Sequence, residues 1–521
     1  MKLVTAAEMR RLDEQTINEL GLPSLTLMEN AARATLQALL NELGPPKRLL
    51  VLAGKGNNGG DGIALARLAN ELGLKAEVYL ALGEPKGDAR FQLELFKKLG
   101  GEVLTGEPDF SKYDLAVDAL FGTGFEPPLR GEPARLAEKL NASPVKVLAV
   151  DLPSGLSADE GAVKGPAVRA DLTVTFQFPK LCHVLYPASA YCGKVFVADI
   201  SIPPRLAEGV KREVLLAHEL KLYRRSPDTY KTREGHLLVV GGSEGKTGAV
   251  ALACRAATRA GAGLVTAGVP GGLAPVLETL LLEEMVLPLG EGSRLSLLAL
   301  NELLNERGRY CALVLGPGMG RYEEGQDLVV TLLERWEGPL LIDADGLNNL
   351  ADAGRLELLR ERPYPTVLTP HLGEFERLSG VTPKEAAGRL TEVARAFAER
   401  YGCYLVLKGA RTAVAAPDGE VFLSVRGTPA MAKGGSGDAL AGVLGALLCK
   451  LEPKEALKLG VYLHGLAGEL AEKESHREGM RVLELVEALP KAYALLERLQ
   501  KSFKPSYPLF KLLEGPGKRE A

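Results

Sequence analysis

Two glycine-rich segments, each with an aspartate, are the stretches of this sequence best suited to hold an anion and to move a proton. The first, GNNGGDG, spans residues 56–62 and contains Asp61; the second, AKGGSGDALAG, spans residues 432–442 and contains Asp438. Glycines between a strand and a helix let backbone N–H groups approach a phosphate. Neither segment has the spacing of a Walker A loop or a dinucleotide fingerprint in its usual place, so they predict two different ligand sites.

In the first segment, the side chains of Asn57 and Asn58 add carbonyl oxygens to the backbone N–H groups of Gly59 and Gly60. The alternative interpretation is a tight turn in which Asp61 only caps the next helix. A turn needs one or two glycines, whereas this segment has four glycines and two asparagines. The composition therefore favours a ligand site.

Two further polar loops follow expected strands in the same half of the chain. AVDALFGTG places Asp118 at a strand end, and AVDLPSG does the same with Asp151 and Ser154. Such loops meet beyond the carboxyl ends of the strands in an open α/β sheet. Asn58, Asp118 and Ser154 would then offer oxygen ligands suited to a group-I or group-II cation. One such aspartate alone could be a helix cap, but three converging loops favour a site.

The second segment predicts an anion hole with a base beside it. Gly434, Gly435 and Gly437 open an apolar helix whose N–H groups and dipole attract an anion. Asp438 could take a proton from a substrate hydroxyl as it attacks a phosphoryl group. The alternative, an aspartate that only complements the helix dipole, explains the glycines poorly. His371, in LTPHLGE, could contact a substrate, and the other five histidines are interpreted as structural.

A third segment, VVGGSEGKTGAV (residues 239–250), has part of the pattern of a P-loop. Only three residues separate Gly241 from Gly245, whereas a Walker A loop has four between its glycines. A glycine loop on the substrate side is therefore favoured over a P-loop, and replacement of Lys246 would discriminate between them.

Length, charge and cysteine usage set the class of protein. The chain has 521 residues, 46% of them hydrophobic, which predicts two or three domains. A formal net charge of -3 implies no nucleic-acid or acidic-membrane partner. With no apolar signal region and no apolar run of ~18 residues, a cytoplasmic chain is expected. The six cysteines form no C-x-x-C pair and are expected to be reduced core residues: Cys182, Cys192, Cys254, Cys311, Cys403 and Cys449.

Short β-rich runs alternate with helical patterns along the chain, which predicts parallel sheets covered by helices on both faces. The strands expected in the first half are Arg48–Ala53, Ala76–Leu80, Leu115–Asp118, Val147–Val150, Leu172–Phe176 and Lys194–Asp199. Those expected in the second half are Leu237–Val240, Leu264–Val269, Ala312–Leu315, Leu340–Asp343, Val367–Thr369, Tyr404–Leu407, Ala413–Ala416 and Val421–Val425. Helices are expected at Asp61–Leu72, Asp438–Lys450, Lys454–Lys473 and Val482–Leu499.

Pro203 and Pro204 interrupt the first pattern, and the alternation restarts at Gly235. The expected division is one domain over residues 1–210, a second over 211–500, and a tail over 501–521. Because the tail contains Pro505, Pro508 and Pro516, it is expected to be a loosely packed extension.

Seven of these motifs, in order, resemble those of a known family. NNGGDG, DALFGTG and DLPSG are similar to the NAD(P)H-hydrate epimerase domain. GPGMG, TPHLGE, KGARTAV and AKGGSGDALAG are similar to the ADP/ATP-dependent NAD(P)H-hydrate dehydratase, a ribokinase-like domain. Over nearly the whole chain the order resembles the fused bifunctional nicotinamide nucleotide repair enzymes of bacteria. The resemblance implies an N-terminal Rossmann-like three-layer αβα domain followed by a ribokinase-like α/β domain.

The resemblance also implies two reactions. The first domain would be an isomerase that interconverts the R and S forms of hydrated NADH and NADPH (NADHX and NADPHX). The second would be a lyase that phosphorylates the S form at its hydroxyl and releases phosphate to restore NAD(P)H, with ADP converted to AMP. The implied ions are K+ in the first domain and Mg2+ in the second. The implied partners are NADHX, NADPHX and ADP, with no nucleic acid and no membrane, in a homo-oligomer.

Carried over residue by residue, the resemblance assigns catalysis to Asp151 and Asp438 and the K+ site to Asn58, Asp118 and Ser154. The epimerase substrate would contact Asn57, Asn58, Gly59, Gly60, Asp61, Gly122, Thr123, Gly124, Phe125, Glu126, Pro127, Pro128 and Asp151. The dehydratase substrate would contact Gly320, His371 and Asp438, with the loop from His371 to Arg377. The nucleotide would contact Lys408, Gly409, Ala410, Arg411, Thr412, Thr428, Gly434, Gly435, Ser436 and Gly437. Leu372 replaces a proline common in the family, which would leave the His371 loop less constrained.

The residues by themselves leave three alternatives open. A ribokinase-class enzyme acting on a vitamin or sugar hydroxyl would release a product that keeps its phosphate. A P-loop NTPase would depend on Lys246 for nucleotide binding. A first domain that only binds its ligand would need no catalytic group, and the presence of Asp151 and the cation residues argues against it.

Overall fold

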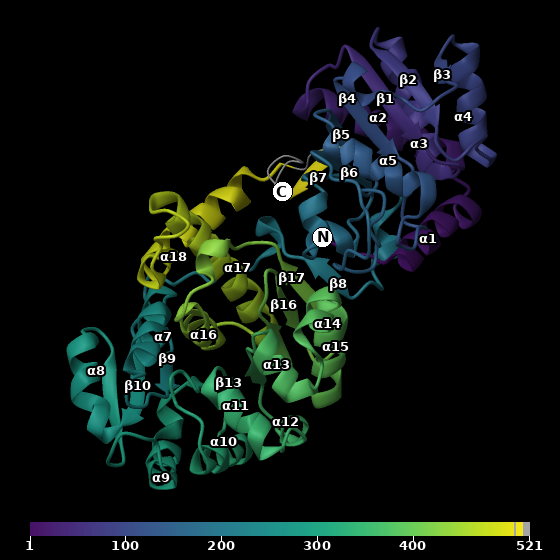
Figure 1. The fold of residues 1–521 in the computed structure, drawn as a ribbon. Helices are drawn as coiled ribbons and strands as arrows, with labels where there is room; N and C mark the ends of the chain where they lie inside the picture. Colours follow the sequence, from purple (N-terminus) through teal and green to yellow (C-terminus); the bar gives the residue numbers. More distant parts are fainter. Residues whose placement is uncertain (505–506, 514–521) are drawn as a thin grey trace. The chain divides into compact units, whose positions relative to one another are not determined.

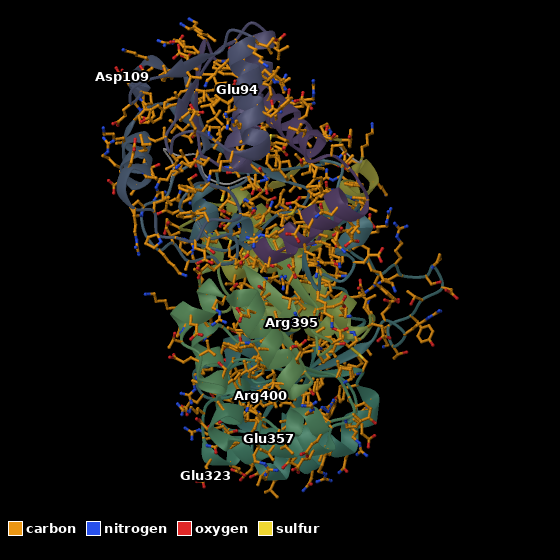
Figure 2. All side chains as sticks on the ribbon, turned by 90° about the vertical axis from the view of Figure 1, so that its right-hand side faces the viewer. Glu94, Asp109, Glu323, Glu357, Arg395 and Arg400 are labelled. Carbon is orange, nitrogen blue, oxygen red and sulfur yellow. A yellow bond between two sulfur atoms is a disulfide. The ribbon has the colours of Figure 1, made fainter. Side chains whose placement is uncertain are left out.

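Residues 1–504 and 507–513 are described by the structure, a computed structural model. The chain divides into unit 1, made of Met1–Lys211 with Lys504–Ala521, and unit 2, made of Arg212–Phe503. Each unit has its own sheet (Figure 1). Charged side chains are exposed on both units, for example Glu94 and Asp109 on unit 1 and Glu323, Glu357 and Arg400 on unit 2 (Figure 2).

In its described residues, unit 1 has an eight-stranded sheet in the order β18-β7-β6-β5-β4-β1-β2-β3. All neighbouring strands are parallel except β18, which is antiparallel to β7. The strands are β1 (Arg48–Ala53), β2 (Lys75–Leu80), β3 (Glu102–Leu104), β4 (Leu115–Ala119), β5 (Lys146–Val150), β6 (Leu172–Phe176), β7 (Lys194–Ala198) and β18 (Leu509–Leu513). The helices are α1 (Ala6–Glu14), α2 (Ser24–Glu42), α3 (Asn57–Glu71), α4 (Gly87–Lys98), α5 (Gly131–Ala142) and α6 (Leu181–Val184).

Alternate residues of β1 pack into two separate cores, because successive side chains of a strand point to opposite faces. Leu49, Val51 and Ala53 belong to the core shared with α1–α4, whereas Leu50 and Leu52 belong to the core shared with α5. Helices therefore cover both faces of the sheet. This confirms the predicted three-layer αβα arrangement.

Unit 2 has a ten-stranded sheet, counted over its described residues, in the order β11-β10-β9-β12-β13-β14-β15-β16-β17-β8. Only β16 is antiparallel to its neighbours. The strands are β8 (Arg212–Val214), β9 (His236–Val240), β10 (Leu264–Pro270), β11 (Met285–Leu289), β12 (Ala312–Leu315), β13 (Leu340–Ile342), β14 (Thr366–Leu368), β15 (Tyr404–Leu407), β16 (Thr412–Ala415) and β17 (Val421–Ser424).

Helices cover the unit 2 sheet as predicted for an α/β domain. Val239 and Ala267 pack in one core with α7, α16, α17 and α18, while Leu238 and Val240, which point to the other face, are buried as well. The helices are α7 (Thr247–Arg259), α8 (Ala274–Leu280), α9 (Leu297–Glu306), α10 (Glu323–Arg335), α11 (Asp345–Ala353), α12 (Leu358–Glu361), α13 (Leu372–Ser379), α14 (Pro383–Gly388), α15 (Leu390–Tyr401), α16 (Ser436–Leu448), α17 (Pro453–Glu474) and α18 (Val482–Ser502). In the described part of the chain, no helix combines the length and apolar character needed to cross a bilayer.

The C-terminal segment differs from its expected state. A loosely packed tail was expected, but Leu509–Leu513 form β18, which pairs with β7 at the edge of the unit 1 sheet. The run LFKLL alternates only weakly, so the strand depends on the partner edge rather than on its own pattern. Residues 505–506 and 514–521, which include Pro505 and Pro516, lie outside the described residues.

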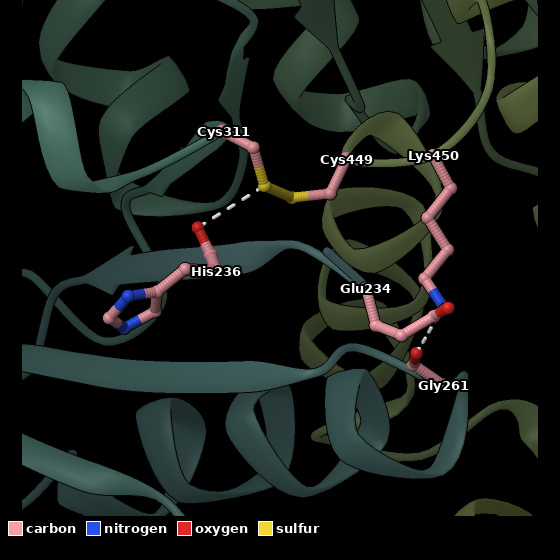
Figure 3. Close-up of a disulfide and its surroundings, with 6 residues drawn as sticks. All are labelled: Glu234, His236, Gly261, Cys311, Cys449 and Lys450. Carbon is pink, nitrogen blue, oxygen red and sulfur yellow. Dashed lines mark hydrogen bonds and ion pairs between the residues drawn. A yellow bond between two sulfur atoms is a disulfide. The ribbon is translucent and has the colours of Figure 1, made fainter. Parts of the chain in front are cut away.

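Two of the six cysteines are not reduced, contrary to the sequence prediction, but form a disulfide (Figure 3). Cys311, just before β12, and Cys449, at the end of α16, form a disulfide across a sequence separation of 138 residues. A side chain at Gly235 would place its Cβ 2.6 Å from Cys449 Cβ, so the glycine leaves room for the bridge. Tertiary packing of α16 on the sheet brings the two residues together, and their spacing along the chain carried no such signal. The remaining cysteines, Cys182, Cys192, Cys254 and Cys403, are free and buried, as expected.

Candidate active sites

The unit 1 site lies where the strand order reverses. β1 is flanked by β2 and β4, so the loops that follow β1 and β4 diverge and leave a crevice between them. A cavity of about 660 Å3 occupies this place. Of the predicted substrate residues, it is lined by Asn57, Asn58, Asp61, Gly122, Thr123, Gly124, Phe125, Glu126 and Asp151.

Two glycines of the first segment, Gly59 and Gly60, serve close packing of α3. A Cβ at Gly59 would lie 2.0 Å from the carbonyl oxygen of Gly54, and one at Gly60 would lie 2.6 Å from Cε of Met28. Gly59, Gly60, Pro127 and Pro128 were predicted to contact the substrate, but they are not among the described residues that line the cavity. The glycines therefore let α3 approach β1 and α2 closely enough to place Asn58 and Asp61 at the cavity wall.

The helix after this segment starts earlier than predicted. α3 begins at Asn57 with Gly56 as its N-cap, so Asp61 lies about one turn inside the helix. The expected start at Asp61 is wrong because the glycines adopt helical geometry. Asp61 therefore does not cap α3, which removes the alternative interpretation of this residue.

The three predicted cation ligands come from the ends of neighbouring elements. The carboxylate of Asp118 accepts hydrogen bonds from the backbone N–H (2.7 Å) and the hydroxyl (2.6 Å) of Ser154. Burial raises the pKa of the Asp118 carboxyl to about 6, against the effect of these bonds. The side-chain Oδ1 and Nδ2 of Asn58 are buried and have no hydrogen-bond partner. A buried amide oxygen without a donor is the observation here that fits a bound cation.

Asp151 is paired with Lys180, a residue that the sequence motifs did not indicate. The Nζ atom of Lys180 lies 2.7 Å from Oδ1 of Asp151 and also donates to the hydroxyl of Thr175 (2.8 Å). Only 1% of the Lys180 side chain is exposed. Burial acts to raise the pKa of the Asp151 carboxyl, but the charge and hydrogen bond of Lys180, together with His183 and the hydroxyl of Thr175, hold the pKa below its usual range. The only sequence signal for Lys180 was its position just after β6.

Two further acids share this cavity. Burial, together with the charges of Asp151 and Asp13, raises the pKa of Asp61 well above its ordinary value. Burial likewise raises the pKa of Asp13, which comes from α1, to about 6. The cavity therefore holds the Asp151 carboxyl, whose pKa is lowered, beside two carboxyls whose pKa values are raised. Carboxyls whose pKa values are pushed apart are suited to act as base and acid.

The unit 2 site also lies at a reversal of strand order, between β9 and β12. The N–H group of Gly320 donates to Oδ2 of Asp345 (2.9 Å), and Nζ of Lys246 lies 3.0 Å from the same oxygen. Lys246 is thus tied to the predicted substrate residue Gly320. This placement favours the substrate-side glycine loop over a P-loop.

Asp438 lies in the first turn of α16, whose N-cap Gly435 has φ +96°. Lys408 Nζ lies 2.9 Å from Oδ1 of Asp343, which also accepts from the hydroxyl of Thr369 (2.7 Å). A Cβ at Gly437 would lie 3.1 Å from Lys408 Nζ, so the ammonium lies against the start of α16. Burial, followed by the charge of Asp343, raises the pKa of Asp438 to about 6.

His371 caps α13 and is held in place although Leu372, and not a proline, follows it. Its Nδ1 accepts from the N–H of Gly373 (3.0 Å), while Glu374 accepts from the N–H of His371 (2.8 Å). The side chain of His371 is 62% exposed, and a backbone bridge joins His371 to Lys408. The reciprocal capping bonds take over the restriction that a proline would supply.

The predicted nucleotide residues differ in their surroundings. Gly409, Ala410 and Gly434 are exposed, and Ser436 and Gly437 are partly exposed in the first turn of α16. Arg411 is buried and donates to the carbonyl of Val425 (2.8 Å). Thr412 opens β16, and the hydroxyl of Thr428 bonds to Glu472.

Sequence reasoning missed Asp343 and Asp345, although both follow β13 in LLIDAD. The sequence pattern predicted this segment only as the strand Leu340–Asp343. Their position at a strand end was the same signal that identified Asp118 and Asp151. In the described residues, no three histidine, cysteine, aspartate or glutamate side chains are grouped to hold a metal ion.

Comparisons with known proteins cover both units. The family model of the YjeF-related protein N-terminus matches residues 24–182, and that of NAD(P)H-hydrate dehydratase matches residues 237–491. The bifunctional NAD(P)H-hydrate repair enzyme Nnr of Moorella thermoacetica is 41% identical over 519 residues, which cover 95% of this chain and 97% of the relative. The enzyme of the same name from Thermofilum pendens is 37% identical, with 95% and 97% coverage. Among solved structures, the ADP/ATP-dependent NAD(P)H-hydrate dehydratase of Bacillus subtilis, co-crystallised with ATP and Mg2+, is 30% identical and covers 53% of this chain and 94% of its own, with a TM-score of 0.45.

Proposed function

Because this chain belongs to the family of bifunctional NAD(P)H-hydrate repair enzymes, we propose that unit 1 interconverts the R and S forms of NADHX and NADPHX and that unit 2 dehydrates the S form to NAD(P)H. In unit 2, ADP would supply the phosphoryl group and leave as AMP. The observation that carries the proposal is that each unit has its own set of polar residues beyond the carboxyl ends of its own strands. We further propose the cytoplasm, which contains these dinucleotides and ADP, as the place of action.

In unit 1, the reacting carbon carries a hydroxyl and is bonded to the ring nitrogen. Inversion of the configuration at this carbon requires either its C–O bond or its C–N bond to break and to re-form on the other face. A protonated carboxyl, for which Asp61 is suited, can assist departure of the group, and the ionised Asp151 can take up the proton that is released. Lys180 keeps Asp151 ionised and fixes the direction of its carboxylate.

In unit 2, the substrate hydroxyl attacks the terminal phosphorus of ADP while Asp438 accepts its proton. The P–O bond to AMP breaks, and the N–H groups of the Gly434–Gly437 turn, with the ammonium of Lys408, stabilise the charge on the phosphoryl oxygens. The phosphate ester then loses phosphate and a ring proton, which leaves the carbon–carbon double bond of NAD(P)H. Phosphate is a far better leaving group than hydroxide, which explains why a nucleotide is consumed.

The side chains present fit one ion in each unit. In unit 1, Asn58, Asp118 and Ser154 would hold K+, because the amide oxygen of Asn58 is buried without a donor. In unit 2, the charges of Asp343, Asp345 and Glu374 act to raise the pKa of Asp438, and Lys408 lowers it. Mg2+ would relieve this excess of negative charge. It would bind through one or two of these carboxylates together with nucleotide phosphates, as is usual for Mg2+, and would neutralise charge on the transferred group.

The direct test is recovery of reduced nicotinamide absorbance when the protein is mixed with NADHX and either ADP or ATP. We expect full recovery from a mixture of R and S forms with one of the two nucleotides, and none without nucleotide. No recovery with either nucleotide would contradict the proposal. Phosphorus NMR of the products separates this reaction from that of a ribokinase-class kinase, since a kinase product keeps its phosphate.

A further inference from the structure

The buried imidazole of His183 joins the backbones of the two residues that form the unit 1 ion pair. Its Nδ1 lies 2.9 Å from the backbone nitrogen of Lys180, and its Nε2 lies 2.8 Å from the carbonyl oxygen of Asp151. A backbone N–H group can only donate, so Nδ1 must accept and the proton must lie on Nε2. Nε2–H therefore donates to the Asp151 carbonyl.

Asp151 needs such a contact because its backbone is in the left-handed region. Its φ is +66°, which non-glycine residues adopt only where the surroundings hold them. The N–H of Asp151 donates to the carbonyl of Val174 (2.8 Å), and its own carbonyl accepts from His183. Hydrogen bonds thus hold both the N–H and the carbonyl group of Asp151 in this unusual conformation, and the carboxylate is directed at Lys180.

The environment of His183 keeps the ring neutral. The side chain is fully buried, and burial, together with the charge of Lys180, lowers its pKa to about 4. The charged groups near the ring are Lys180 and Asp151, both held in place by it, while Asp13 and Asp61 face the cavity. His183 is not among the described residues that line the cavity, so it can act only through its two neighbours.

We propose that His183 is a positioning residue of the epimerase site, whose neutral ring fixes the left-handed backbone of Asp151 and the start of α6 so that carboxylate and ammonium stay paired at the cavity wall. The inference rests on the proposed function of unit 1. It assigns a role to a histidine that the sequence pattern indicated as merely structural.

The two amide variants separate the two bonds. An asparagine side chain places its polar atoms near the position of Nδ1, and a glutamine places them near that of Nε2. His183→Asn therefore keeps an acceptor for the N–H of Lys180 but loses the donor to Asp151, whereas His183→Gln keeps the donor. Thr173→Val is a matched control, because Thr173 is a fully buried residue of the same unit whose hydroxyl bonds to the backbone of Cys192.

The experiment measures epimerisation by the full chain over a range of pH. For His183→Asn we expect kcat to fall by ~10²-fold, the scale of a misplaced catalytic group, with KM nearly unchanged. We also expect the acidic limb of its pH–rate profile to move to higher pH, because Asp151 without the adjacent ammonium of Lys180 would hold its proton to a higher pH. His183→Gln should keep kcat within a few-fold of the wild type, and Thr173→Val should lose stability but keep both kcat and the limb.

Equal kcat values and acidic limbs for His183→Asn, His183→Gln and the wild type would overturn the inference while leaving the proposed function intact. A wild type that does not epimerise would instead overturn the proposed function, and the inference with it. Nitrogen-15 NMR of the wild type provides a test that does not depend on the variants folding. A ring protonated on Nδ1 at neutral pH would contradict the inference, and the Nε2–H tautomer supports it.

Discussion

The ammonium of Lys408 lies 2.9 Å from the carboxylate of Asp343, and this ion pair lies against the first turn of α16, which carries Asp438. Asp343 raises the pKa of Asp438, and Lys408 lowers it. The pair therefore does two things at once: it fixes a cation at the anion-binding turn and it tunes the base that lies beside that turn.

Replacement of Asp343 by asparagine should shift the pH dependence of dehydration. Asp438 must be ionised to accept a proton, so wild-type kcat/KM should fall as the pH drops through about 6, the pKa of Asp438. Removing the negative charge of Asp343 favours ionised Asp438 and should move this fall to lower pH. Asp418→Asn, which affects an ion pair with Lys454 at the surface, is the matched control and should leave the profile unchanged. A profile for Asp343→Asn that coincides with the wild type would show that the two carboxyls are not coupled.

Replacement of Asp438 by asparagine should remove the base while keeping the size of the side chain. General bases contribute ~10²–10⁴-fold, so nucleotide-dependent dehydration should fall by that order. Calorimetry should find the affinity for ADP nearly unchanged, and the acidic limb of the rate should disappear. Full activity would mean that Asp438 only complements the dipole of α16.

Epimerisation should depend on K+ through the side chain of Asn58. With the ionic strength kept constant, exchange of K+ for a tetraalkylammonium ion should slow interconversion of the R and S forms by the wild type. Asn58→Leu fills the same space without an oxygen and should raise the K+ concentration needed for half-maximal rate or abolish the dependence. Dehydration of pure S form serves as the internal control. Equal rates in the two salts would count against a cation at this position.

Replacement of Asp151 by alanine should separate the two activities in one chain. It should abolish interconversion of the R and S forms yet leave dehydration of the pure S form within a few-fold of the wild type, since independent sites act additively. On a mixture of forms, the progress curve of nicotinamide absorbance should stop when the S form is used, apart from slow spontaneous epimerisation. Loss of activity on the pure S form would indicate that the two units share one site.

Reduction of the Cys311–Cys449 bridge should destabilise unit 2. A cross-link that closes a loop of more than 100 residues contributes up to ~5 kcal/mol in the chain-entropy model, and usually less. The melting temperature of the wild type should therefore fall on addition of a thiol, whereas the variant Cys311→Ala/Cys449→Ala should not respond. Cys254→Ala, which removes a free buried cysteine, should keep the response of the wild type. A wild-type melting temperature that does not change with reductant would mean that the bridge adds no stability.

The sequence predicted the elements that have a strong local signal. β1, β6, β12 and β15 have the expected bounds, because each is an apolar run between turn residues. The strands at the four sheet edges were missed: β3 and β8, which are only three residues long, β11, which contains Pro288, and β18, whose alternation is weak. Short edge strands form where a neighbouring strand offers hydrogen bonds, which is a property of the folded sheet.

The site residues divide in the same way: those in a local motif were predicted, and those that depend on tertiary contacts were not. Strand-end loops rich in glycine and aspartate were visible in the sequence, and the structure brings Asn58, Asp61 and Asp151 to one cavity. Lys180, Asp343 and the ring of His183 were not recognised, because each acts through contacts to residues of other segments, which the folded chain alone brings together. An ion pair between Lys408 and Asp343, 65 positions apart, can be seen only once the sheet has brought β13 and β15 near each other.

Because β18 is the last strand of the chain, the sheet of unit 1 can be completed only after unit 2 has been synthesised. All of unit 2 is encoded between β7 and the strand that covers the edge of β7. While a ribosome is still making unit 2, the sheet of unit 1 presents β7 as an open edge, which is a surface prone to pairing with other chains. A gene cut at the boundary between the units would give β18 to the wrong product: the separated epimerase would keep its open edge, and the separated dehydratase would carry a strand that has no sheet to join.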